Sequence, residues 1–405
     1  MDISHRKVSK VLKITDADNN PISNEKVHVS LKNHEFLFGC GAFEAIPFVN
    51  MPDDGNPWKK LVTEGMDKWL DVFNYGTLPF YWGNYEREEG KTDEHLLLPT
   101  AKFLQSKGVK VKGHPLCWHT VCANWLMQYD NATILKKQLE RIDREVGTYK
   151  GVIDMWDVIN EVVIMPIFDK YDNAITRICK EKGRVGLIKQ VFDEAHSINP
   201  GATLLLNDFN TSISYEILID GCLSAGVPIS AIGIQSHQHQ GYWGKEKIEE
   251  VLERYSHFGL PIHFTENTIL SGSLVPEYIE DLNDWQVEEW PSTPEGEERQ
   301  CKELEEMYRM LFAHPLVEAI TTWDFRDGAW LKAPSGIIRK DGTVKPAYDM
   351  LKNLIHKEWS TDETLTTDEN GFVRLDAFKG EYIIEAKGTN TDAVFSDDGE
   401  QQIII

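Results

Sequence analysis

The stretch VIDMWDVINE (residues 152–161) is apolar along most of its length and ends in an amide and a carboxylate, Asn160 and Glu161. Its apolar and β-branched residues favour a buried strand. Ionising a carboxylate in such surroundings is costly unless something compensates for it. The end of this strand is therefore a place where a functional group is expected.

Seven further stretches repeat the pattern of an apolar run that ends in polar or aromatic groups. They span residues 37–43, 75–82, 109–119, 203–210, 229–237, 261–267 and 319–325. Several are apolar throughout, which is typical of strands buried on both faces. Helical patterns lie between them, for example over residues 133–150, 185–198, 247–258 and 298–314.

Alternating strands and helices predict an α/β fold with a parallel sheet. Eight such units over roughly 320 residues fit a (β/α)8 barrel with some long loops, which we assign to residues 36–358. A doubly wound open sheet is the alternative, but no Gly-rich phosphate loop follows the first strand.

The two ends of the chain have a different pattern. Residues 8–35 contain short alternating strands around an Asp-Asn-Asn-Pro turn, and residues 364–395 alternate between Asn-Gly and Lys-Gly turns. Neither piece has enough strands to be stable alone, and together they resemble a small β-sandwich of the carboxypeptidase regulatory-like type. We therefore predict one sandwich built from residues 1–35 and 359–405, which either caps the barrel by packing or binds glycan.

Composition limits the partners of the protein. A net charge of −23 argues against nucleic acid or an anionic membrane as a partner. Twelve Trp and thirteen Tyr suit either a packed interior or platforms on which sugar rings stack. No segment is apolar and long enough to span a bilayer. No signal-peptide pattern follows Met1, but a chain trimmed of its signal would look the same. The compartment stays open, and secretion or the cell surface is expected if a signal was removed.

The six cysteines stand apart from one another, mostly inside apolar runs. Neither a zinc-binding spacing nor a disulfide framework is visible among them. We expect them to be mainly buried thiols.

In a barrel of this kind the chemistry belongs at the carboxyl ends of the strands. The predicted ends carry a coherent set of groups: His114, Trp118, His119, Asn160, Glu161, Asn207, Asp208, Gln235, His237, Glu266 and Trp323. Two carboxyl groups facing each other across a barrel mouth suit glycoside hydrolysis. One donates a proton to the leaving oxygen while the other attacks or stabilises the sugar cation.

These groups also have other interpretations. Asn160 and Glu161 could begin a helix, with the asparagine as its cap. Four histidines could be core residues or ligands of a metal-dependent barrel hydrolase, although no His-x-His closes the first strand; they are His114, His119, His237 and His239.

Five motifs occur in order across most of residues 36–355: GHPLCWH, WDVINE, GIQSH, FTEN and TTWDF…W…KPAYDML. Together they resemble glycoside hydrolase family 10, the β-1,4-xylanase family with a (β/α)8 barrel. The resemblance implies a retaining mechanism, with Glu161 as general acid/base and Glu266 as nucleophile. It implies neither a metal nor an organic cofactor, and a β-glycan of the xylan type as substrate.

The same resemblance gives roles to the surrounding residues. Asn160 would hold the 2-hydroxyl of the sugar at the cleavage point, and His237, reached through Gln235, would orient the nucleophile. The residues expected to line the same subsite or to enclose the sugars are His114, Trp118, Trp323 and Trp330.

The sequence departs from the family pattern at the site for the next sugar on the glycone side. Family members usually carry Glu-Asn-x-x-Lys-Trp after the second strand, whereas this chain has TLPFYW (residues 77–82). Trp82 fits, but Tyr81 stands where the lysine belongs and Leu78 near the asparagine. The lost donors would each have contributed about 1 kcal/mol or more. We therefore expect this site, with Tyr81 and Trp82, to be apolar and reshaped.

A second departure follows the predicted nucleophile, where the family's Glu-Leu-Asp is Glu266-Asn267-Thr268. His237 thereby lacks its usual carboxylate partner. Three functions stay open: a β-1,4-xylanase acting on xylan or decorated xylo-oligosaccharides, a relative that hydrolyses another β-glycoside, and a barrel that only binds glycan. Retention of both glutamates argues against the third.

Overall fold

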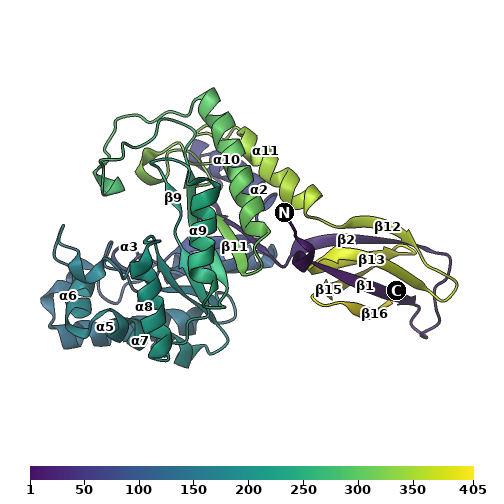
Figure 1. The fold of residues 1–405 in the computed structure, drawn as a ribbon, viewed down its shortest axis with the longest axis horizontal. Helices are drawn as coiled ribbons and strands as arrows, with labels where there is room; N and C mark the ends of the chain where they lie inside the picture. Colours follow the sequence, from purple (N-terminus) through teal and green to yellow (C-terminus); the bar gives the residue numbers. More distant parts are fainter.

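The computed structural model describes the whole chain, Met1–Ile405, and at its centre parallel strands form a closed ring. The strands of the ring are β3 (Leu37–Gly41), β4 (Tyr75–Pro79), β5 (Lys110–His114), β6 (Met155–Asn160), β7 (Thr203–Asp208), β8 (Ala231–Ile234), β10 (Ile262–Ile269) and β11 (Val317–Thr322). Strand β11 pairs with both β10 and β3, which closes the ring. The predicted (β/α)8 barrel is confirmed (Figure 1).

Helices follow the strands and cover the outside of the ring. They are α1 (Ala45–Asn50), α2 (Pro57–Leu70), α3 (Trp82–Tyr85), α4 (Glu94–Ser106), α5 (Asn131–Tyr149), α6 (Ala174–Lys182), α7 (Arg184–Ile198), α8 (Ile213–Ser224), α9 (Gly244–Ser256), α10 (Pro294–Phe312) and α11 (Pro346–Asn353). In α5 the Asp130 side chain caps the first turn by accepting a hydrogen bond from the Thr133 amide at 2.8 Å. Ile134, Ile142 and Val146, spaced by eight and four residues, form its buried face.

The prediction of one continuous sixth strand over residues 229–237 is wrong. This stretch consists of β8 and a separate two-residue strand, β9 (His237–Gln238). At Gln235 and Ser236 the chain leaves the β7–β8 ladder, and His237 pairs instead with Thr268 near the end of β10. This change of partner brings His237 beside the seventh strand of the barrel.

The two ends of the chain pair with each other in two further sheets, as predicted. One sheet has the order β13 (Phe372–Phe378), β1 (Lys7–Thr15), β16 (Gly399–Ile404), and the other has the order β12 (Asp362–Thr366), β2 (Lys26–His34), β14 (Gly380–Ala386), β15 (Thr389–Phe395). Alternate residues such as Leu12, Val29 and Ile384 point between the sheets and form a core of their own. The sandwich lies at one end of an elongated molecule, with the N-terminus near its junction with the barrel and the C-terminus beside its strands (Figure 1).

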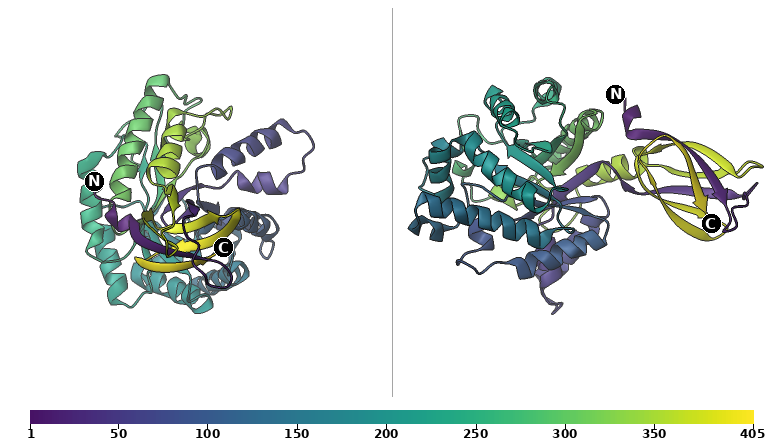
Figure 2. Two further views of the ribbon diagram at one scale, coloured as in Figure 1. Left: turned by 90° about the vertical axis from the view of Figure 1, so that its right-hand side faces the viewer. Right: turned by 90° about the horizontal axis from the view of Figure 1, so that it is seen from below.

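The sandwich lies against the barrel end where the strands begin (Figure 2). Arg6 donates hydrogen bonds to the carbonyls of Phe312, His314 and Val317, just before and at the start of β11. Asn33 donates to the Gly108 carbonyl, two residues before β5. The opposite end, where the strands finish, is left for the functional site.

The six cysteines are all free thiols, and four of them are buried, which confirms the expectation from the sequence. Among the helices, none combines the length and the apolar character that crossing a bilayer requires.

Candidate active site

Glu161 follows the last residue of β6 and has a left-handed backbone with φ of 58°. A non-glycine residue in this region costs of order 1 kcal/mol or more, and such residues cluster at functional sites. Trp118 Nε1 donates to Glu161 Oε2 at 2.8 Å, and Gln235 Nε2 donates to Oε1 at 3.2 Å. Residues that follow β5 and β8 therefore fix both oxygens of this partly exposed carboxyl group.

The alternative in which Asn160 caps a helix is wrong. Asn160 ends β6, and its Oδ1 accepts hydrogen bonds from Gln235 Nε2 at 3.1 Å and Asn207 Nδ2 at 2.9 Å. Its own Nδ2 is buried and has no hydrogen-bond partner. Buried donors are almost always paired, so an unpaired donor at a barrel mouth is a candidate for binding a substrate hydroxyl.

Asn207, at the end of β7, connects this amide to the second carboxyl group. Its Nδ2 donates to Glu266 Oε1 at 2.8 Å, and its Oδ1 accepts a hydrogen bond from Thr265 Oγ1 at 2.7 Å. The side chain lies over Gly233 on β8, where a Cβ atom would stand 2.6 Å from Asn207 Oδ1. Only glycine at position 233 leaves room for this link.

Glu266 is held on its other oxygen by His237, whose Nε2 lies 3.1 Å from Oε2. The second ring nitrogen of His237 lies 2.8 Å from Thr268 Oγ1. A hydroxyl can donate or accept, so Thr268 permits a neutral His237 that directs its Nε2–H at the carboxylate. An aspartate at position 268 could only accept. Thr268 therefore takes the place of the aspartate that the family pattern has at this position, and its hydroxyl contacts His237.

The two carboxyl groups have opposite electrostatic surroundings. Burial raises the pKa of Glu161 to about 8, and the negative charge of Glu266 adds to this effect. Burial also raises the pKa of Glu266, but His114 and His237 outweigh it, so the net pKa lies below its usual value. At neutral pH the pair thus holds one protonated and one ionised carboxyl group.

His114 belongs to a buried charged group beneath Glu266. Its Nδ1 lies 2.7 Å from Asp157 Oδ2, and Lys112 Nζ lies 2.7 Å from the same oxygen. His114, Asp157 and Glu266 are close enough together to be considered as metal ligands. The Lys112 ammonium, however, already occupies the Asp157 oxygen that a cation would need.

Two of the other histidines that were considered as metal ligands, His119 and His239, are not part of this cluster. His119 packs on Phe168 with ring centroids 4.6 Å apart, and His239 packs on Trp330 at 5.0 Å. Burial lowers the pKa of His119 to about 4 and that of His239 to about 3. Their burial and their packing against aromatic rings favour the interpretation of His119 and His239 as core histidines.

Aromatic side chains surround the carboxyl pair. The Trp323 ring lies 5.3 Å from His114 and 6.0 Å from His237, and Trp330 lies 4.5 Å from His237. Tyr81 stands 5.7 Å from His114 and 5.6 Å from Trp118. These rings form walls of the site on its β4, β5 and β11 sides.

Trp82 is not part of this arrangement. Its side chain is buried, donates a hydrogen bond to Glu86 at 2.9 Å and meets Trp125 edge-on at 5.8 Å. The difference from Tyr81 arises because Tyr81 precedes the first turn of α3, whereas Trp82 begins it and faces inward.

A pocket of about 280 Å³ opens on the far side of Tyr81, between the ends of β3 and β4 and the start of α4. Most of its lining is apolar, and its polar groups are an amide, a cation and a carboxylate; the lining residues are Phe43, Ile46, Pro79, Tyr81, Asn84, Tyr85, Arg87, Asp93, Leu96 and Leu97. Tyr81, which also contacts His114 and Trp118, is the residue that this pocket shares with the surroundings of the carboxyl pair.

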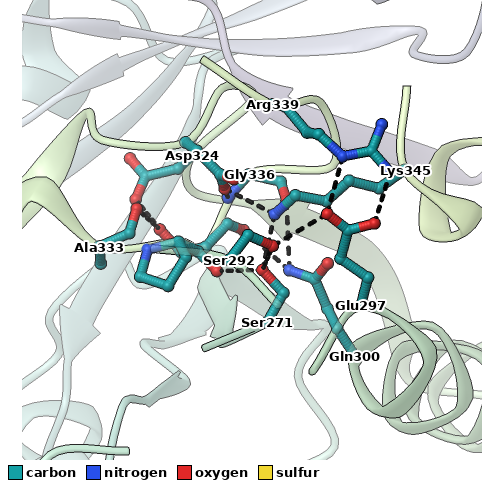
Figure 3. A network of polar contacts seen from close by, with 12 residues as sticks. Ser271, Ser292, Glu297, Gln300, Asp324, Ala333, Gly336, Arg339 and Lys345 are labelled. Carbon is teal, nitrogen blue, oxygen red and sulfur yellow. Dashed lines mark hydrogen bonds and ion pairs between the residues drawn. The ribbon is translucent and has the colours of Figure 1, made fainter. Parts of the chain in front are cut away.

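A buried polar network supports the loop that follows β11 and carries Trp323 and Trp330 (Figure 3). Lys345 Nζ contacts Asp327 Oδ1 at 2.6 Å, Ser271 Oγ at 2.7 Å and the Gly336 carbonyl at 2.8 Å. Lys345 is fully buried, and a buried ammonium is stable only when it is paired and hydrogen-bonded in this way. Lys345 begins the stretch KPAYDML, whose sequence pattern alone does not indicate this role.

Comparison with known proteins places these features in a family. The model of glycosyl hydrolase family 10 matches residues 81–354. The chain is 25% identical over 393 residues to the anti-sigma-I factor RsgI6 of Acetivibrio thermocellus, covering 94% of this chain and 45% of that protein. It is 30% identical over 243 residues to a β-1,4-xylanase of Dictyoglomus thermophilum, covering 56% and 64%. The chain thus spans about half to two thirds of the length of these two relatives.

Among solved structures, a family 10 protein from Paenibacillus barcinonensis superposes with a TM-score of 0.63 at 22% identity. The match covers 80% of this chain and 95% of that one, which supports the barrel fold. The family model matches well over half of the sequence, and its match runs from Tyr81 through the ends of six of the eight barrel strands. The chain is a member of glycosyl hydrolase family 10.

Proposed function

We propose that this chain is a retaining β-glycosidase that acts on β-1,4-xylosidic bonds in xylan or decorated xylo-oligosaccharides. The observation that carries the proposal is the carboxyl pair: Glu161 with its pKa raised to about 8 and Glu266 with its pKa lowered. Retaining hydrolysis needs one carboxyl group that gives a proton and one that attacks as an anion, and this split satisfies both.

Each carboxyl group has a defined part in the proposed reaction. Glu266 attacks the anomeric carbon while Glu161 gives its proton to the departing glycosidic oxygen, so a glycosyl ester forms on Glu266 and an alcohol leaves. Glu161, now ionised, takes a proton from water, and the water oxygen displaces Glu266 from the sugar. The sugar regains a hydroxyl with the original configuration, and Glu161 regains its proton.

The neighbouring side chains support these two steps. The unpaired Nδ2 of Asn160 is placed to donate to a hydroxyl of the sugar, while Gln235 and Asn207 keep this amide from turning. His237 directs a ring nitrogen at the Glu266 oxygen opposite to the one that Asn207 binds. Trp323 and Tyr81 would enclose the ring.

Xylan as the substrate rests on the relatives, several of which are named endo-1,4-β-xylanases. The altered TLPFYW stretch favours a change in detail, because Tyr81 and the pocket beside it offer an apolar wall where the family pattern has a lysine. A β-glycoside other than xylan is therefore the second candidate for this chain.

The test is a product profile on xylan, arabinoxylan, mixed-linkage glucan and aryl β-xylosides and β-glucosides, with the configuration of the first product read by NMR. Release of β-configured xylo-oligosaccharides is the expected result. Turnover of another β-glycoside alone would support the second candidate. An α-configured first product would contradict the retaining mechanism.

A barrel that only binds glycan is the remaining alternative. It is favoured by the similarity to a protein named as an anti-sigma factor over 94% of this chain. Binding of xylo-oligosaccharides without hydrolysis of any substrate in the panel would establish it. The energetic cost of holding Glu161 in a left-handed backbone conformation, together with its raised pKa, argues for catalysis, since a binding site needs neither feature.

A further inference from the structure

Two long loops from opposite sides of the barrel mouth meet in this protein. The β6 loop (residues 161–173) begins at Glu161, and the β10 loop (residues 270–293) begins directly after β10, which carries Glu266. Lys170 Nζ lies 2.5 Å from Asp281 Oδ2 and 2.9 Å from Asp284 Oδ1. We call these three residues the ionic bridge. Strands β7 and β8 lie between the strands whose loops it joins.

The β10 loop is a packed structure with its own small core. Leu270, Val275 and Trp290 are buried in it together with Ala333. Gln240, from the loop after β9, donates to the carbonyls of Pro276 and Ile279 at 3.1 and 2.8 Å. The loop reaches outward at the end of the barrel remote from the sandwich (Figure 1, green, upper left).

The β6 loop is anchored as firmly at its base. Arg184 donates to the carbonyls of Val162 and Val163, and Thr176 Oγ1 donates to the Met165 carbonyl at 3.0 Å. Further along, Phe168 packs on Tyr171 with ring centroids 4.8 Å apart. Both loops therefore present Lys170 and its two acidic partners from fixed positions.

The two glutamates divide the mouth into two halves. His114 ends β5, and Tyr81 and Trp323 follow β4 and β11, on the side away from the bridge. In the proposed reaction the sugar that is attacked contacts these rings, so the leaving group must lie over β7 and β8. The ionic bridge joins the β6 and β10 loops, which follow the strands on either side of β7 and β8.

We infer that the ionic bridge of Lys170, Asp281 and Asp284 closes the leaving-group side of the cleft and restricts the leaving group to one or two sugars. This inference rests on the proposed function. It specifies the substrate class as chains cleaved close to their reducing end, because a longer leaving group would have to pass beneath the joined loops.

Tyr171 follows Lys170 in the β6 loop, and its side chain is half exposed. Burial raises its pKa, and the charges of Glu161 and Asp281 contribute smaller parts of the rise.

The test uses xylohexaose carrying ¹⁸O at its reducing end, so that mass spectrometry shows which bond is cut. The wild-type protein should cut the first or second bond from the reducing end. Lys170→Ala should move cleavage inward and raise the share of internal cuts about threefold. The size follows from the modest strength of an exposed ion pair.

Two further variants sharpen this result. Lys189→Ala removes an exposed ion pair with Asp193 on α7, away from the mouth, and should leave the cleavage pattern unchanged. The charge-exchanged pair Lys170→Asp with Asp281→Lys should restore cutting near the reducing end. Identical patterns for the wild type and Lys170→Ala would overturn the inference.

Failure of the proposed function is recognised separately. If neither the wild type nor any variant hydrolyses xylohexaose or an aryl glycoside, the function is wrong, and the bridge is then tested by calorimetric binding. Lys170→Ala should improve the affinity for xylohexaose relative to xylobiose about threefold. Equal ratios, or no binding of either sugar, would overturn the bridge as well.

Discussion

The two ends of the barrel treat polar groups in opposite ways. Where the sandwich meets the barrel, the Arg6 guanidinium donates to three backbone carbonyls, and Asn74 side-chain atoms bond three backbone groups of residues 34–38. At the mouth, Asn160 keeps an unpaired donor and Glu161 keeps a strained backbone and a raised pKa. At the sandwich end the polar groups are paired and stabilise the fold. At the mouth, the Asn160 donor is left to be paired when substrate binds.

Replacing Glu266 gives the largest expected effect at the mouth. Glu266→Gln removes the attacking anion, and kcat/KM should fall by a factor on the order of 10⁴ or more. The unfolding temperature should fall slightly, because the lowered pKa of Glu266 means that its ionised form is stabilised by His114 and His237 in the folded protein. Steady-state kinetics and calorimetry measure the two effects. A large loss of stability together with activity would contradict the separation of roles between the two ends.

Glu161→Gln should lower kcat/KM on xylan about 10²- to 10⁴-fold, as expected for a lost general acid. An aryl glycoside with an acidic phenol needs less protonation of its leaving oxygen, so its first step should be affected much less. A pre-steady-state burst of phenol would show this. Equal losses on both substrates would contradict the role of Glu161.

The same residue makes activity and stability depend on pH in linked ways. Glu161 must be protonated to act, and its pKa is raised to about 8, so wild-type activity should fall as the pH rises through 8. The stability that protonated Glu161 contributes is complete below its ordinary pKa of 4.5 and is lost by pH 8. Glu161→Gln should therefore unfold at a higher temperature than the wild type at pH 9, and the advantage should disappear near pH 4.

Changes at Thr268 should have smaller effects, because this residue acts through His237. Thr268→Val removes the hydroxyl beside Nδ1, and kcat/KM should fall about tenfold. Thr268→Ser keeps the hydroxyl and should stay close to the wild type. Thr268→Asp can only accept a hydrogen bond, which favours a charged His237 and should move the acid limb of the pH profile to lower pH. An unchanged pH profile for Thr268→Asp would show that the contact with residue 268 does not control the protonation of His237.

Arg6→Met tests the opposite end and should leave kcat/KM unchanged. It removes hydrogen bonds from a charged group to three carbonyls, so the barrel–sandwich unit should lose about 2–3 kcal/mol of stability. Calorimetry should show an unfolding temperature lower by several degrees. Lys26→Met, at an exposed position at the start of β2, is the control and should change neither quantity. Lost activity in Arg6→Met would show that the two ends are coupled.

Much of this organisation follows from the sequence, because strand ends and the residues that follow them are local in sequence. The Asn160-Glu161 end of β6 and the Glu266 position on β10 could be predicted in this way. The break between β8 and β9 could not, since it depends on His237 pairing with Thr268, thirty-one residues away. Residues 170, 281 and 284, which form the ionic bridge, are charged surface positions in the loops after β6 and β10, and nothing in their local pattern identifies a partner.

Trp82 shows a different limit. The family pattern aligns it with a substrate-site residue, yet the first turn of α3 directs it into the core while its neighbour Tyr81 faces the site. The residue at which the short helix α3 begins decides which of the two side chains faces the site, and this starting residue cannot be predicted from the sequence alone.

The pairing of the chain ends has a consequence for synthesis on the ribosome. Both partners of strand β1, β13 and β16, lie near the end of the chain. Lys7 pairs with Phe378, so this sheet cannot form until residue 378 has been synthesised. At about 5–20 residues per second, that interval lasts roughly 20–75 s. During this time β1 and β2 have exposed edges while the barrel strands emerge and assemble. The sandwich is therefore the last part of the chain to become whole, and its early strands are the segment most in need of protection by a chaperone.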